Sequence, residues 1–171
     1  MSEELFDIID DATGKVTGTA PRKKCHGNPS LIHRSVRVMV FHPDGASMLL
    51  QKRAAAKDIF PGRWDCAVGG HLDSGETYEE AAVREMGEEL GLPPNLPLRH
   101  LFDMKVRNEI ESENVREFST VSGGPFTIQR AELDEVRFFS FAELKRIRKE
   151  HPEEMTPLLT MELDELVKTG M

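Results

Sequence analysis

Three glutamates stand close enough in the sequence to share one metal ion. Glu85, Glu88 and Glu89 lie within residues 77–90, a segment whose apolar spacing predicts a helix. At about 100° per residue, the three carboxylates fall on one face of that helix, at the margin of its apolar stripe. Like charges on adjacent turns repel each other, and a hard divalent cation such as Mg²⁺, which takes oxygen ligands, would offset the repulsion. The spacing therefore predicts a metal site beside a cleft.

Small and basic residues flank the three glutamates. Gly69 and Gly70 precede them, and the absence of side chains there lets the backbone approach a metal or a phosphate closely. Arg84 lies four residues before Glu88 and can pair with it or reach back toward Glu76. A run of acidic residues alone is usually a solvated helix face, so it is the complete pattern that favours a functional site.

The elements that would position these residues are strands, one central helix, more strands and then helices. Strands are predicted at residues 5–9, 16–19, 35–42, 47–52, 65–69, 98–106, 115–121 and 135–140. Helices are predicted at 77–90, at 143–149 and from Thr156-Pro157 onward, so that the C-terminal helices lie within about 141–169. The apolar stripe predicted for the last helix is Leu159, Leu163, Leu166 and Val167. This order favours a mixed α/β or α+β sandwich over a regular parallel βαβ series.

The composition narrows the classes of partner. The chain has 171 residues with 22 Lys and Arg against 30 Asp and Glu, for a net charge of −8 and a pI near 5.3. This balance argues against a nucleic-acid or anionic-membrane binder, whereas a bound cation could still attract an anionic small molecule. Residues 1–4 are acidic, unlike a signal peptide, no apolar run is long enough to span a membrane, and Cys25 and Cys66 form no disulfide framework. We therefore expect a cytoplasmic protein with a small-molecule partner. The sequence is compatible with both a monomer and a homodimer.

The complete pattern around the glutamates resembles the Nudix box, G-x5-E-x7-R-E-U-x-E-E-x-G-U, where U is a bulky apolar residue. Residues 70–92 match it at every position: Gly70, Glu76, Arg84, Glu85, Met86, Glu88, Glu89, Gly91 and Leu92. Seven fixed residues at roughly 6% each would match one window by chance about once in 10⁸ to 10⁹. The resemblance implies the Nudix fold, a mixed β-sheet sandwiched between α-helices, as a single domain over residues 1–171.

The resemblance also implies an activity, which is metal-dependent hydrolysis of a diphosphate (P–O–P) linkage in a nucleoside diphosphate derivative or a related small molecule, with Mg²⁺ or Mn²⁺. The metal ligands carried over by position are Glu85, Glu88, Glu89 and the carbonyl group of Gly69. Structural roles in the box fall to Gly70, Glu76, Arg84 and Gly91. A carboxylate must activate the attacking water. Glu85 or Glu88 is the first choice, and the loop alternatives are Glu109, Glu111, Glu113 and Glu117.

Motifs outside the box resemble the branch that contains isopentenyl-diphosphate isomerase and its hydrolase-like relatives. They are Thr17-Gly18-Thr19, Leu31-Ile32-His33, Gln51-Lys52-Arg53-Ala54, Phe60-Pro61-Gly62-Arg63-Trp64 and Gly70-His71. This resemblance implies a second metal site made of His26, His33, His71 and Glu113. An isopentenyl-diphosphate delta-isomerase is therefore the alternative function. It is disfavoured because Gly69 takes the place of the catalytic cysteine, and because the second glutamate of the isomerase pattern falls on or near Val115.

The remaining candidates carry weaker signals. Arg53, Lys57 and Arg63 flank the site and could clamp a distal phosphate, although ordinary surface charge accounts for them equally well. Trp64 and Cys66 are predicted to be packing residues. Substrate specificity is expected to reside in the loops around residues 54–61 and 104–114.

Overall fold

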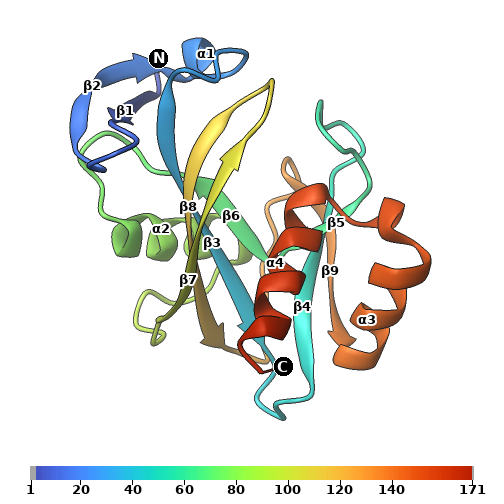
Figure 1. Ribbon diagram of the computed structural model, residues 1–171. Coiled ribbons are helices and arrows are strands. Elements are labelled where there is room, and N and C mark those ends of the chain that lie inside the picture. The colour runs from blue at the N-terminus through green and yellow to red at the C-terminus, as the bar shows by residue number, and fades with distance from the viewer. Residues whose placement is uncertain (1–2, 171) are drawn as a thin grey trace.

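The computed structural model describes residues 3–170 and shows a mixed sheet with helices on both sides (Figure 1). The strands are β1 (Leu5–Ile9), β2 (Val16–Pro21), β3 (Ile32–Phe41), β4 (Ser47–Arg53), β5 (Trp64–Cys66), β6 (Val68–His71), β7 (Arg99–Arg107), β8 (Ser112–Val121) and β9 (Leu133–Ser140). The helices are α1 (Arg22–Cys25), α2 (Tyr78–Leu90), α3 (Phe141–Glu150) and α4 (Pro157–Lys168), with a 3₁₀ helix, η1, at Pro152–Glu154. The predicted fold class is confirmed. None of the described helices is both long and apolar enough to cross a membrane.

The larger sheet has two arms that meet at the β3–β4 hairpin. One arm has the order β6–β3–β8–β7, and in the other β4 pairs with β9 on one side and β5 on the other. β3 runs parallel to β8, whereas the other pairs are antiparallel. Because β3 and β4 pair only at Phe41 and Met48, beside their turn, the two arms separate away from the hairpin (Figure 1). β1 and β2 form a separate hairpin sheet.

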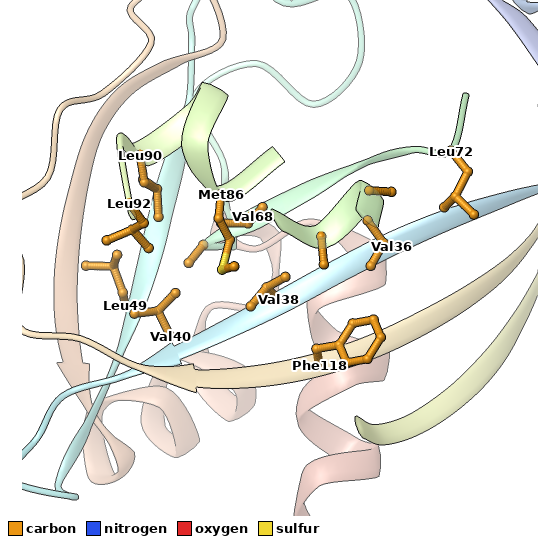
Figure 2. Close-up of a cluster of buried hydrophobic side chains, with 13 residues drawn as sticks. Val36, Val38, Val40, Leu49, Val68, Leu72, Met86, Leu90, Leu92 and Phe118 are labelled. Carbon is orange, nitrogen blue, oxygen red and sulfur yellow. The ribbon is translucent and has the colours of Figure 1, made fainter. Parts of the chain in front are cut away.

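β3 is buried on both faces because its side chains alternate between two helical layers. Val36, Val38 and Val40 lie in the cluster that contains Met86 and Leu90 of α2, and Figure 2 shows these side chains facing one another. Met39, on the opposite face of β3, packs in a second cluster with apolar side chains of α3 and α4. The strand at the centre of the sheet is thus fixed between α2 and the C-terminal helices.

α2 carries the box glutamates, and local sequence signals set both of its ends. The side chain of Thr77 accepts a hydrogen bond from the N–H of Glu80, as an N-cap residue does. Gly91 ends the helix in the left-handed conformation, with φ 65°, which costs glycine no strain. Its N–H donates to the carbonyl group of Gly87. The predicted helix over 77–90 is therefore confirmed, with Thr77 as its cap.

Two predictions about the elements were wrong. Residues 65–69 do not form one strand, because the chain crosses there from one arm to the other. Cys66 ends β5, which pairs with β4, and Val68 begins β6, which pairs with β3. In α4, Val167 is 55% exposed, and Glu162 lies on the buried face in its place. The other predicted strands and helices are present, with ends shifted by a few residues.

Candidate active site

The three box glutamates line an open cleft of about 470 Å³. The rest of the lining comes mainly from β3, β4, β6 and the β4–β5 loop, so the cleft lies where the two arms separate. The carboxylates sit at different depths, since Glu88 is exposed, Glu85 is half-buried and Glu89 is buried. One face of α2 therefore offers the cleft three carboxylates in three different environments.

Glu85 lies directly against the backbone of Gly70. A Cβ atom at residue 70 would come within 2.2 Å of Glu85 Oε1 and 2.9 Å of its Cγ, so the space that a side chain would need is taken by the carboxylate. Burial raises the pKa of Glu85, although Nη1 of Arg84 donates a hydrogen bond to it at 2.8 Å and opposes the shift. Glu85 is thus a partly desolvated carboxylate fixed in position by a glycine and an arginine.

Glu89 contacts the backbone of Gly69, the residue before Gly70 in β6. The N–H of Gly69 donates to Glu89 Oε2 at 3.0 Å. Burial, reinforced by the negative charge of Glu85, raises the pKa of Glu89 to about 8. Two desolvated carboxylates that repel each other are stabilised by a shared cation, so this pair fits a metal ion.

Arg84 joins the loop before α2 to the helix itself. Its Nε and Nη2 donate to the two oxygens of Glu76, each at 2.8 Å. Nη2 also donates to the carbonyl group of His71 at 3.1 Å. Nη1 donates to Glu85 at 2.8 Å and to Glu88 at 3.4 Å. The same guanidinium therefore fixes the loop and neutralises part of the charge of the carboxylates.

The N-terminal hairpin supports this loop through Asp7 of β1, which the sequence analysis did not identify. Asp7 accepts hydrogen bonds from Ser74 Oγ at 2.6 Å, from the N–H of Gly75 at 2.9 Å and from Arg34 Nη2 at 2.9 Å. Burial alone would raise the pKa of Asp7, but these hydrogen bonds and the charge of Arg34 outweigh it and lower the pKa. Asp7 is 67 positions from Ser74, so no local spacing marks it.

A second cluster of candidate metal ligands borders the same cleft. Ligand atoms of His33, His71, Glu111 and Glu113 all lie within 4.8 Å of one another. Glu113 Oε1 is 3.2 Å from His33 Nε2 and 2.8 Å from His71 Nε2. Nδ1 of His33 lies 3.4 Å from the carbonyl oxygen of Leu31, and a proton on Nδ1 would leave Nε2 free to bind a metal. Two imidazoles and two carboxylates suit a divalent transition metal.

This cluster contains one residue, Glu111, that was not among its predicted members. Glu111, directly before β8, lies beside Glu113, whereas Val115 is buried and apolar. Burial and the negative charge of Glu113 raise the pKa of Glu111 to about 7. His26 lies at the edge of the cluster, with its Nε2 3.8 Å from Glu111 Oε2. That Nε2 is buried and has no hydrogen-bond partner.

Basic side chains reach the cleft from several elements. Arg53 and Lys57 line it. Arg63 is not among the lining residues, and its guanidinium lies over the ring of Phe60, 4.9 Å from the ring centroid. The structure therefore does not place Arg63 with the other two predicted phosphate ligands. Two further basic residues that line the cleft are Arg22 and Arg37.

A buried ion network ties the floor of the cleft to α4. Nε of Arg37 donates to Glu162 Oε1 at 2.6 Å, and its Nη2 pairs with Asp65. Each of these three residues is at most 9% exposed. A Cβ atom at Gly69 would come within 2.8 Å of Arg37 Nη1, so the guanidinium lies directly beneath that backbone. The C-terminal helix is thereby connected to the strand that presents Gly69.

Cys66 and Glu117 are buried next to this network and do not line the cleft. The thiol of Cys66 donates to the carbonyl oxygen of Val38 at 3.2 Å and lies 3.6 Å from Glu117 Oε1. Burial raises the pKa of the thiol and of the Glu117 carboxyl group well above their ordinary values. Trp64 packs edge-on against Phe139, 4.8 Å between ring centroids. The prediction that Cys66 and Trp64 are packing residues is confirmed.

The chain is similar to known proteins over most of its length. A family model described as NUDIX domain matches residues 31–159. Nudix hydrolase 3 of Arabidopsis thaliana is 31% identical over 166 residues, which are 89% of this chain and 21% of that protein, so the chain spans about a fifth of this relative. The isopentenyl-diphosphate Delta-isomerase of Nocardia farcinica is 30% identical over 162 residues, 92% of this chain and 91% of that one. The crystal structure of DR0079 from Deinococcus radiodurans shares the fold with a TM-score of 0.76 and 24% identity, over 97% of this chain and 98% of that one.

Proposed function

Because the chain belongs to the NUDIX family, we propose that it is a metal-dependent hydrolase that cleaves the P–O–P linkage of a nucleoside diphosphate derivative or a related small molecule. The observation that carries this proposal is that the three box glutamates border one cleft with two basic side chains, Arg53 and Lys57. Water attack on a diphosphate needs carboxylates that hold a metal and accept a proton, and cations that bind the phosphates. The cleft offers both.

The donor set at the box fits a divalent cation. Burial raises the pKa values of Glu85 and Glu89, and the negative charge of Glu85 raises the pKa of Glu89 further. Together with Glu88 and the carbonyl group of Gly69, they would hold Mg²⁺ or Mn²⁺ through oxygen ligands. When bound, the ion neutralises negative charge that develops on the phosphate oxygens.

We assign the proton transfer to Glu88. Its side chain is 54% exposed and lines the open cleft, whereas Glu85 is engaged by Arg84 at 2.8 Å. Glu88 would accept a proton from the water molecule as the water oxygen bonds to phosphorus and the bond from phosphorus to the bridging oxygen breaks. The departing phosphate would be held by Arg53 and Lys57, two of the basic side chains that line the cleft.

Phosphorus NMR tests this function directly. The purified protein is incubated with Mg²⁺ and a panel of ADP-ribose, NADH, a flavin dinucleotide, coenzyme A, a nucleoside triphosphate and isopentenyl diphosphate. We expect at least one panel member to be split into products with shorter phosphate chains, and to stay intact when EDTA replaces Mg²⁺. A panel in which every P–O–P linkage survives would contradict the proposed substrate class, and cleavage in EDTA would contradict the metal dependence.

We propose further that His33, His71, Glu111 and Glu113 hold a second divalent ion beside the first. The support is their mutual approach within 4.8 Å and the buried, unpartnered Nε2 of His26 next to Glu111. Imidazole ligands favour Mn²⁺ or a later transition metal over Mg²⁺ here. The box carboxylates and this cluster would then bring two cations to one cleft.

Glu113→Gln is expected to remove one of two metal-binding events. The amide keeps the size of the carboxylate and can still accept the hydrogen bond that Ser35 Oγ gives to Oε2 at 2.8 Å, so the fold should persist. Calorimetric titration with Mn²⁺ should show two sites in the wild-type protein and one in the variant. The exposed Glu109, in the loop between β7 and β8, provides the control, since Glu109→Gln should retain both sites. A single site in the wild-type protein would refute the second ion.

Isomerisation of isopentenyl diphosphate is the second candidate function, because the histidine–glutamate cluster and the Nocardia relative favour it. That reaction protonates an alkene, and the isomerase pattern places the cysteine that takes part in this step at residue 69. Gly69 has no side chain, and Cys66 is enclosed away from the cleft. Proton NMR of the isopentenyl sample separates the two functions, since a shifted double bond with intact phosphates would mean an isomerase.

A further inference from the structure

The β4–β5 loop brings apolar side chains to the cleft that the metal and phosphate sites do not use. Ile59 and Phe60 of this loop line the cleft, and so does Leu158 of α4. Ile59 is 37% exposed, and Phe60 and Leu158 are half-buried. An apolar surface beside carboxylates and cations has no part in binding a diphosphate group, so it is available to the organic group of a substrate.

The backbone of Phe60 is in a conformation that its side chain disfavours. Its φ is +49°, and within residues 3–170 it is the single non-glycine residue with a positive φ. Bulky residues rarely adopt the left-handed region, and such strain persists only where the surroundings impose it, often at functional sites. Here two backbone hydrogen bonds close the loop around Phe60. The N–H of Gly62 donates to the carbonyl group of Arg53 at 3.0 Å, and the N–H of Arg53 donates to the carbonyl group of Arg63 at 2.9 Å.

The position of the Phe60 ring is also linked to the phosphate-binding side of the cleft. The guanidinium of Arg63 covers one face of the ring, 4.9 Å from its centroid. Nε of Arg53 donates to the carbonyl group of Ile59 at 2.9 Å, directly before Phe60 in the chain. The loop therefore holds an aromatic ring and a phosphate-binding cation in one fixed arrangement.

We propose that Phe60 is the specificity-determining residue of the cleft and that its ring stacks on the nucleobase of a nucleoside diphosphate derivative. This inference rests on the proposed hydrolase function and assigns the side chain that recognises the organic group of the substrate. A flat occupant is favoured because an aromatic side chain offers a base a stacking surface, and because a cleft of about 470 Å³ suits a ligand of nucleotide size. Ile59 and Leu158 would contact the edges of the base.

Binding of uncleavable ligands tests the proposal independently of hydrolysis. The probes are the α,β-methylene analogues of ADP, CDP, GDP and UDP, with methylenediphosphonate as the matched ligand without a base. We expect the wild-type protein to bind at least one analogue about tenfold or more tightly than methylenediphosphonate, since a stacked base contributes roughly a factor of ten to a hundred. Calorimetry gives both dissociation constants. Equal affinity for all five probes would overturn the proposal.

Two variants at residue 60 separate a flat ring from mere apolar bulk. Phe60→Leu should lose about tenfold or more in affinity for the preferred analogue and keep the wild-type affinity for methylenediphosphonate. Phe60→Tyr should retain both affinities, which controls for the strained backbone that all three residues share. If Phe60→Leu binds the nucleotide analogue as the wild-type protein does, the ring has no part in recognition. If Phe60→Leu instead loses affinity only for a further probe, the isopentenyl ester of methylenediphosphonate, the apolar surface around residue 60 binds a prenyl group. Both outcomes leave the hydrolase proposal to the phosphorus NMR experiment.

Discussion

Glu88→Gln is expected to lower kcat/KM for the cleaved diphosphate by about 10²- to 10⁴-fold, the range for loss of a general base. Glutamine matches glutamate in size but neither accepts the proton of the attacking water nor binds a hard cation as strongly. Because the Glu88 side chain is 54% exposed, the substitution should change stability by no more than about 0.5 kcal/mol. Steady-state kinetics and thermal unfolding of the same sample measure the two effects.

The matched control for this variant is Glu80→Gln. Glu80 is an exposed glutamate on the same helix and does not line the cleft. It should retain wild-type kcat and KM, so a loss confined to Glu88 cannot come from a change in the net charge of α2. Wild-type turnover in Glu88→Gln would move the base to another carboxylate, and Glu85, the other box carboxylate considered for this role, would be tested next.

Local patterns in the sequence predicted most of the fold and the carboxylates of the site. The alternation of Val36, Val38 and Val40 has the period of a strand, and the apolar positions of α2 have the period of a helix, with Thr77 and Gly91 as its ends. The box glutamates were found because their spacing is itself a local pattern. Features that depend on a few neighbouring residues could be read without knowing how the chain packs.

Features that depend on distant segments could not be predicted in this way. Arg37 and Glu162 are 125 positions apart, and nothing near either residue specifies the other. One signal was present, however, because Glu162 interrupts the apolar face of the last helix. Helical spacing predicted Val167 on that face, whereas Glu162 is fully buried and paired with a buried arginine. A charged residue among the apolar positions of a helix indicates a buried partner elsewhere.

Gly70→Ala is expected to lower kcat/KM by about 100-fold or more with the fold intact, since a catalytic group misplaced by about 1 Å can cost that much. The added methyl group would lie 2.2 Å from Oε1, 2.3 Å from Cδ and 2.9 Å from Cγ of Glu85. These atoms belong to a side chain that can rotate away, so the clash moves the carboxylate rather than the backbone. The movement also breaks the hydrogen bond of 2.8 Å from Arg84. Kinetics and Mn²⁺ titration would both report the displaced carboxylate.

The opposite result is expected for a second glycine-to-alanine change in the box, at Gly87. Gly87 is exposed in the interior of α2, and a Cβ atom there meets nothing nearer than a backbone oxygen at 3.9 Å. Gly87→Ala should keep full activity and stabilise the protein by about 0.4–1 kcal/mol, because alanine has fewer conformations to lose on folding.

A double-mutant cycle then isolates the cause of the Gly70 effect. If Gly70→Ala acts through Glu85, it should cost almost nothing further in a Glu85→Ala background. A full additional loss there would mean that the backbone at residue 70, rather than the carboxylate beside it, carries the effect.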